Sequence, residues 1–143
     1  MAITQAVTNS FKQELLSMTP HTAGDSYKIA LYASTATLNK STTAYSSDNE
    51  VGASGNYSAG GQVLVGFSVT MDGDVPTLDF TTNPQWTGAT ITARGALIYN
   101  STRANKAVLV IDFGVDKTST AGTFDVTFPA PGATTGLIRI TLP

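Results

Sequence analysis

The chain has 143 residues, which is enough for one domain with a buried core and too few for two compact domains of about 100 residues each. Charged residues make up only 13% of the chain and its formal net charge is −2, so charge-driven disorder and the basic footprint of a nucleic-acid-binding protein are both excluded. Cysteine is absent, which excludes thiol catalysis, disulfide bonds and thiolate metal sites, whereas 23 Thr and 12 Ser residues supply neutral hydroxyl groups.

The N-terminus has no targeting pattern. Residues 1–7 carry no basic region and no apolar run of the kind that a signal peptide needs. No other stretch approaches the roughly 20 apolar residues of a membrane-spanning helix. We therefore expect synthesis and assembly in a cytoplasm, and no membrane partner.

Residues 1–20 are predicted to form an amphipathic helix or arm. Its apolar side chains recur every three or four residues, at Ile3, Val7, Phe11, Leu15 and Met18. Thr4 is the expected N-cap, and Pro20 should end the helix near residues 17–19. The apolar face packs either on its own domain or on a partner subunit, so Val7, Phe11, Leu15 and Met18 are candidate interface residues.

Residues 27–33 are predicted as a strand, because large apolar residues occupy alternate positions. Residues 34–61 then form a long segment rich in Ser, Thr, Gly and Asn. A loop of this length inside a compact domain is usually functional, or disordered until it is bound. Its scattered apolar residues indicate that it docks on a surface, and Leu38, Tyr45 and Tyr57 are candidate interface residues.

From residue 62 onward, short β patterns alternate with turn residues. The sequence Asp-Gly-Asp at residues 72–74 predicts a hairpin turn, since Gly readily takes the positive φ that a tight turn needs. Pro84 and Trp86 are placed in a connection. Strands are predicted over residues 62–71, 75–80, 91–99, 106–113, 123–128 and 136–142.

The fold class that this pattern predicts is mainly β. Seven or eight short strands with Gly, Pro and Asp between them are typical of an antiparallel β-sandwich or barrel-like sandwich. The whole chain, residues 1–143, is expected to be one domain. The N-terminal helix or arm (1–20) and an extended loop or arm (34–61) complete it.

The sequence offers little for catalysis. His21 is the only histidine, and we interpret it as an exposed or capping side chain. Asp72 and Asp74 flank a Gly and read as solvated turn residues, and Asp112 lies at a strand end. A glycoside hydrolase pairing Asp72 with Asp74 or Asp112 is the enzyme alternative. We expect no enzyme, no cofactor and no bound metal.

Two arginines are further candidates for an interface. Arg94 lies within a β pattern, and Arg139 lies in a strongly apolar terminal strand. A charged residue in such a place either faces solvent or contacts a partner, and Arg is enriched at interfaces.

Six segments of the sequence are distinctive when they are taken together: residues 10–16, 27–32, 42–45, 50–51, 92–100 and 106–114. They resemble a family of small structural proteins of tailed-bacteriophage particles, and the resemblance spans nearly the whole chain. The role it implies is a capsid decoration, or cement, protein. Such a protein is a β-rich subunit, commonly a homotrimer, on the outer surface of the virion head where copies of the major capsid protein meet. The resemblance carries over no active-site residue.

A second virion role stays open. The chain is alternatively a head-fibre or tail-associated protein that binds host glycans. A glycan site needs exposed aromatic side chains, and the credible ones are Trp86, Tyr45 and Tyr57.

Overall fold

The computed structural model describes residues 2–141 and contains one helix and eight strands in that range. The helix is α1 (Asn9–Leu16). The strands are β1 (Ala6–Val7), β2 (Tyr27–Tyr32), β3 (Gln62–Val63), β4 (Phe67–Asp72), β5 (Val75–Phe80), β6 (Gln85–Asn100), β7 (Lys106–Asp125) and β8 (Ile138–Arg139).

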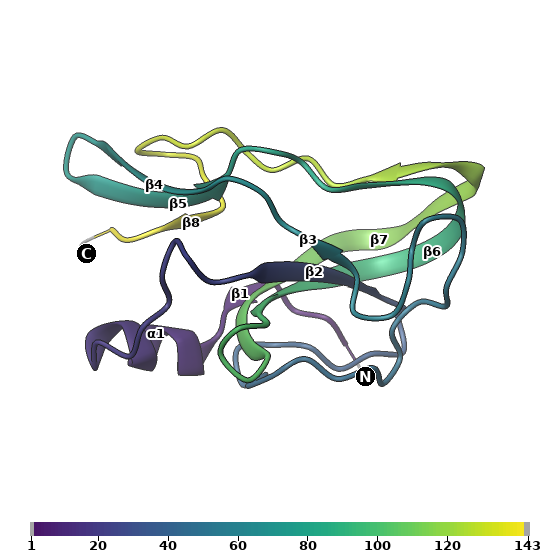
Figure 1. Cartoon of the computed structure of the whole chain (residues 1–143), viewed down its shortest axis with the longest axis horizontal. Helices are drawn as coiled ribbons and strands as arrows, with labels where there is room; N and C mark the ends of the chain where they lie inside the picture. The colour runs from purple at the N-terminus through teal and green to yellow at the C-terminus, as the bar shows by residue number, and fades with distance from the viewer. Residues whose placement is uncertain (1, 142–143) are drawn as a thin grey trace.

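The strands form two antiparallel sheets. The large sheet has the order β1-β7-β6-β2-β3, and the small sheet has the order β4-β5-β8. The long β6–β7 hairpin occupies one part of the molecule, and the small sheet extends beyond it on the other side, above α1 (Figure 1). The predicted fold class is confirmed: the chain is mainly β, antiparallel and sandwich-like, and it is not a closed barrel.

The main core lies between the two sheets. Strands β2 and β6 place one set of alternate side chains there, including Ile29, Leu31 and Ile98, all at most 1% exposed. Phe80 of β5 and Ile138 of β8 close the core from the small sheet. The layers are therefore held by apolar contact across the sandwich.

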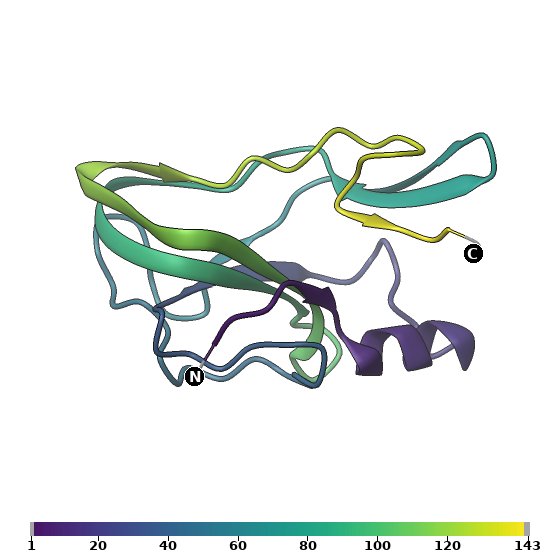
Figure 2. The same cartoon turned by 180° about the vertical axis from the view of Figure 1, so that it is seen from behind.

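The opposite face of the large sheet is also buried. Ala30, Tyr32 and Leu97 point to that side and form a second cluster with Ile3 and Leu38. The chain near residues 2–5 and the segment 34–49 cover it, on the side of the large sheet away from the small sheet (Figure 1, and from behind in Figure 2). This explains why β2 is apolar at nearly every position, and residues 96–99 of β6 at every position, rather than at alternate ones.

The prediction of a helix from the first residues onward is wrong. The helix begins at Asn9 and is capped by Thr8, whose Oγ1 accepts a hydrogen bond from the Phe11 amide (3.3 Å). Ile3 instead forms a parallel bridge with Leu38, and Val7 pairs with Leu109 of β7. A free edge of the large sheet offers these residues backbone partners, and that outweighs their helical spacing. The helix ends at Leu16, and its C-cap Ser17 lies inside the expected range.

Several strand boundaries also differ from the prediction. The run 62–71 is broken at Gly66, where φ is +78° and a side chain would collide with Thr81. Trp86 lies inside β6 and is buried, not in a connection. The run 106–113 continues to Asp125, so it takes up the start of the run 123–128. The predicted run 136–142 ends outside the described residues, and within 136–141 the strand covers only two residues. The strand at 75–80 and the turn at 72–74 are as predicted.

Substitution of the cap residue tests the start of the helix. Thr8 is fully buried, and its hydroxyl also donates to the Ala107 carbonyl (3.0 Å). We expect Thr8→Ala to lower the free energy of unfolding by about 1–2 kcal/mol, as measured by urea denaturation. The matched control is Thr4→Ala, because Thr4 is exposed and lies outside the helix. An equal loss in the control would contradict the assignment of Thr8 as the cap.

Candidate interaction surfaces

One carboxylate crosslinks segment 34–61 internally, while backbone hydrogen bonds tie the segment to the large sheet. Among these, the Val51 amide donates to the Leu31 carbonyl (3.0 Å) and the Ala107 amide donates to the Thr43 carbonyl (2.9 Å). Glu50 Oε2 accepts a hydrogen bond from the Tyr45 hydroxyl (2.7 Å), and Glu50 Oε1 accepts from the Tyr57 hydroxyl (2.7 Å) and the Gly60 amide (2.8 Å). The Tyr57 oxygen in turn accepts from the Leu31 amide of β2 (2.9 Å). Charge-assisted hydrogen bonds of this kind are among the stronger ones in proteins. Glu50 therefore joins distant parts of the segment to one another, and Tyr57 carries the link on to β2.

The phenols around Glu50 are held in their donating, protonated form. Burial, with the hydrogen bond to Glu50, raises the pKa of Tyr45 above its usual value, and burial is also the main cause of the raised pKa of Tyr57. Burial and the nearby Glu50 charge raise the pKa of Tyr99 to about 12. The contacts of Glu50 thus persist across the neutral and moderately alkaline range.

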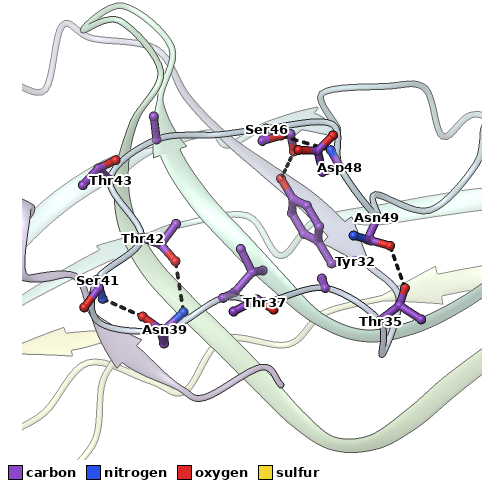
Figure 3. Close-up of a pocket in the computed structure, with 13 residues that line it drawn as sticks. Tyr32, Thr35, Thr37, Asn39, Ser41, Thr42, Thr43, Ser46, Asp48 and Asn49 are labelled. Atoms are coloured by element: carbon purple, nitrogen blue, oxygen red, sulfur yellow. Dashed lines mark hydrogen bonds between the residues drawn. The ribbon is translucent and has the colours of Figure 1, made fainter. Parts of the chain in front are cut away.

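The same segment encloses an open polar cavity of about 500 Å3 (Figure 3). The Tyr32 hydroxyl reaches into it from β2 and donates to the Ser46 carbonyl (2.6 Å). The rest of the lining is mostly hydroxyl and amide side chains of residues 35–49, with Asp48 the one charged side chain among the described lining residues. Such a surface offers many neutral donors and acceptors.

Hydrogen bonds within the segment hold these polar groups in place. The Thr35 hydroxyl donates to Asn49 Oδ1 (2.9 Å), and the Asn39 amide donates to Thr42 Oγ1 (3.0 Å). The Ser41 amide donates to Asn39 Oδ1 (2.8 Å). A partner would therefore meet hydroxyl and amide groups in a fixed arrangement.

A second, apolar surface lies at the other end of the molecule. A groove of about 340 Å3 runs between α1 and β8, and Leu15, Leu16 and Ile140 are among the residues that line it. Leu16 is 88% exposed, and Met18, just past the helix, is 90% exposed. An exposed apolar patch of this kind marks a contact site on a soluble protein.

The nine predicted interface residues fall into three groups. Phe11, Leu38 and Tyr57 are buried by the chain's own packing, so the prediction that their side chains face a partner is wrong. Val7 and Tyr45 are half-buried, and Tyr45 stacks on Tyr99. The remaining four are at least partly accessible: Leu15, Met18, Arg94 and Arg139.

The two arginines have partners within the chain. Arg94 Nε lies 3.0 Å from Asp112 Oδ1, and this contact lowers the pKa of Asp112. Arg139 is exposed, and its Nη1 donates to the Ala133 carbonyl (2.8 Å). The structure does not bring Arg94 and Arg139 together, because they lie in different sheets.

The aromatic residues expected for a glycan site are not available for stacking. Trp86 and Tyr57 are 1% and 2% exposed and pack against each other in the core. Tyr45 is covered by Tyr99 on one ring face. None of the three forms an exposed platform.

The interpretation of His21 as an exposed or capping side chain is wrong. Its side chain is 1% exposed, its Nδ1 lies 3.1 Å from Asn100 Nδ2, and its Nε2 lies 3.3 Å from Glu14 Oε2. Lys106 Nζ also reaches Glu14 Oε2 (2.6 Å). His21 thus joins α1 to the β6–β7 turn in a structural network.

Of the acidic residues considered for catalysis, Asp72 and Asp74 share the β4–β5 hairpin, whereas Asp112 lies in β7. Asp72 accepts from the Ala133 amide (2.7 Å) in the small sheet, and Asp112 pairs with Arg94 in the large sheet. Within residues 2–141, no group of three His, Cys, Asp or Glu side chains is placed to hold a metal ion. In the same range, no helix has the length and apolar character to cross a membrane.

Sequence reasoning missed Glu50 as an anchor and Leu16 and Ile140 as surface residues. The available signal for Glu50 was its position as one of only two carboxylates in the hydroxyl-rich segment, beside three tyrosines in the region 32–57. Comparison of the chain with protein-family models, with curated protein sequences and with solved structures gave no match.

Replacement of Glu50 tests the anchor. Glu50→Gln keeps the shape but puts an amide donor against groups that themselves donate. We expect the free energy of unfolding to fall by about 2–3 kcal/mol and proteolytic cleavage within residues 34–61 to become faster. The control is Asp48→Asn, an exposed carboxylate two residues away. Unchanged cleavage in Glu50→Gln would show that the segment is held by other contacts.

A second ion pair predicts how stability changes with pH. The Arg103 guanidinium, 3.0 Å from Asp25, is the largest cause that holds the pKa of Asp25 well below its usual value. A carboxyl with a lowered folded-state pKa stabilises the fold above about pH 4 and loses that contribution as the pH falls further. We expect urea denaturation between about pH 5 and pH 2 to show a smaller loss of stability in Asp25→Asn than in the wild type. Parallel pH profiles would contradict this.

Proposed function

We propose that the chain is a structural protein of a tailed-phage particle, a capsid decoration protein that binds the outer head surface and clamps neighbouring major capsid subunits. The resemblance of six segments to small phage structural proteins supports the proposal. The surface formed by residues 34–49 supports it independently, since it is suited to broad contact rather than to catalysis.

The observation that carries the proposal is the anchored, hydroxyl-rich segment. Glu50 and the two tyrosines crosslink the segment, and backbone hydrogen bonds to β2 and β7 hold it on the sheet, so its polar groups are ordered before any partner arrives. Binding by a preordered surface avoids the entropy cost of fixing loose side chains and backbone. A clamp that resists outward force on a shell benefits from this rigidity.

The chemistry of the segment also suits a clamp. Hydroxyl and amide groups form neutral hydrogen bonds, which are little affected by salt, unlike contacts between exposed charges. Thr adds a methyl group that packs against a neighbour. With 13% charged residues in the chain, the contact relies on polar neutral groups rather than on ion pairs.

Binding of the purified protein to phage heads tests both the decoration role and the contact surface formed by residues 34–49. Purified protein is added to heads that lack it, and the bound fraction is measured by co-sedimentation at low and high salt. We expect saturable binding that changes less than about threefold between 50 and 500 mM NaCl. The variant Thr37→Asp with Thr43→Asp places charge on two exposed positions of the segment and should weaken binding at least tenfold.

The control for this experiment is Thr118→Asp, an exposed threonine of β7. It should bind like the wild type. Absence of binding to heads contradicts the proposal. Labelled protein that appears on the tail alone would favour the head-fibre or tail-associated role instead. Equal loss in both variants would place the contact elsewhere on the chain.

A further inference from the structure

The small sheet has one apolar face that continues past the core. Register pairs Val69 of β4 with Leu78 of β5, and Leu78 with Ile138 of β8. The next row outward joins Met71 to Pro76, and the Ile140 amide donates to the Pro76 carbonyl (3.2 Å). Paired residues share a face of the sheet. Both rows therefore lie on the face that Phe80 and Ile138 bury in the core.

The outer part of this face is exposed. Val69, Met71 and Ile140 are 58%, 64% and 57% exposed. Across the groove from Ile140, Leu15 and Leu16 of α1 are 39% and 88% exposed. The end of the helix and the small sheet thus form one surface, called here the α1–β4 surface: Leu15, Leu16, Val69, Met71 and Ile140.

The edge of the small sheet is unprotected as well. β4 is an edge strand without proline, and its one charged side chain is Asp72 at its end. Exposed edges in soluble proteins usually carry such residues, because they prevent unwanted pairing with other chains. Residues 67–71 of the edge lack such protection, which leaves their backbone free to pair with another chain.

The area is sufficient for association. The exposed parts of the five side chains amount to roughly 600 Å2, at the upper end of the largest apolar patch on a typical monomer. Two copies that cover each other's surface would bury on the order of 1,200 Å2, at the lower end of the range for specific interfaces.

The charges beside the surface are complementary to one another. Lys12 lines the groove on the α1 side, and Asp74 lies in the turn between β4 and β5 on the other side. Neither side chain is in an ion pair within residues 2–141. A second copy would bring the Asp74 turn of one chain to the α1 helix of the other. We propose that the α1–β4 surface is a contact between copies of this chain, with an apolar centre and a Lys12–Asp74 pair at its rim.

The proposal concerns self-association and does not depend on the capsid role. It is tested on purified protein by light scattering and analytical ultracentrifugation at concentrations from about 1 to 200 μM. We expect a mass of twice 14.9 kDa, because two copies cover each other's surface. A mass of 14.9 kDa over the whole range would overturn the proposal.

Two matched valines locate the contact. Val69→Asp should raise the dissociation constant for self-association at least tenfold. Val115→Asp is the control, because Val115 is 57% exposed and also lies in a strand, but in β7 of the large sheet. Circular dichroism and thermal unfolding confirm that both variants are folded. Equal effects of the two variants, or none from Val69→Asp, would overturn the assignment of the surface.

Exchange of the charges at Lys12 and Asp74 tests whether the partner on the α1–β4 surface is another copy of the chain. Lys12→Asp and Asp74→Lys should each weaken self-association, because each places like charges at the rim. The double variant restores opposite charges at the rim. Its dissociation constant, on a logarithmic scale, should return at least halfway to the wild-type value. An additive loss in the double variant would overturn the Lys12–Asp74 contact.

Discussion

One whole layer of the molecule depends on the hydrogen bonds that fix segment 34–61: those of the Glu50 carboxylate within it, and those between its backbone and the large sheet. The segment that they hold has few apolar residues, so apolar burial alone would do little to offset the entropy lost on ordering it. The carboxylate joins the Tyr45 and Tyr57 hydroxyls and the Gly60 amide to one point beside β2. Leu38 and Tyr32 can then stay buried on the second face of the large sheet.

The molecule has two surfaces of different character, and only one of them belongs to this layer. The polar one is built from segment 34–49, and the apolar one lies at the small sheet and α1. Neutral polar groups suit a contact that forms and persists in water, whereas exposed Val, Leu and Met suit a surface covered by protein. A subunit that meets a foreign surface and its own copies needs both kinds.

Local sequence patterns correctly predicted those elements whose conformation does not depend on partners far away in the chain. The strand at 27–32, the hairpin at 67–80 and the turn around Gly73 follow from alternation and turn chemistry. The start of the chain was ambiguous, since Ile3 and Val7 fit a helical stripe as well as a pair of edge positions. The choice was made by backbone partners 35 and 102 residues away, at Leu38 and Leu109, and no local pattern contains them.

Local patterns were also insufficient to predict which candidate residues are accessible to a partner. Leu38 and Tyr57 are apolar residues in a polar segment, and that pattern describes both an arm for another subunit and a cover for the chain's own sheet. Phe67 and Val69 likewise have the same strand, face and alternation, yet only Phe67 packs against the core, whereas Val69 is 58% exposed. What separates them is how far the opposing layer extends. Exposure at Val69 is therefore a property of tertiary packing, and it becomes evidence for a partner only once the fold is known.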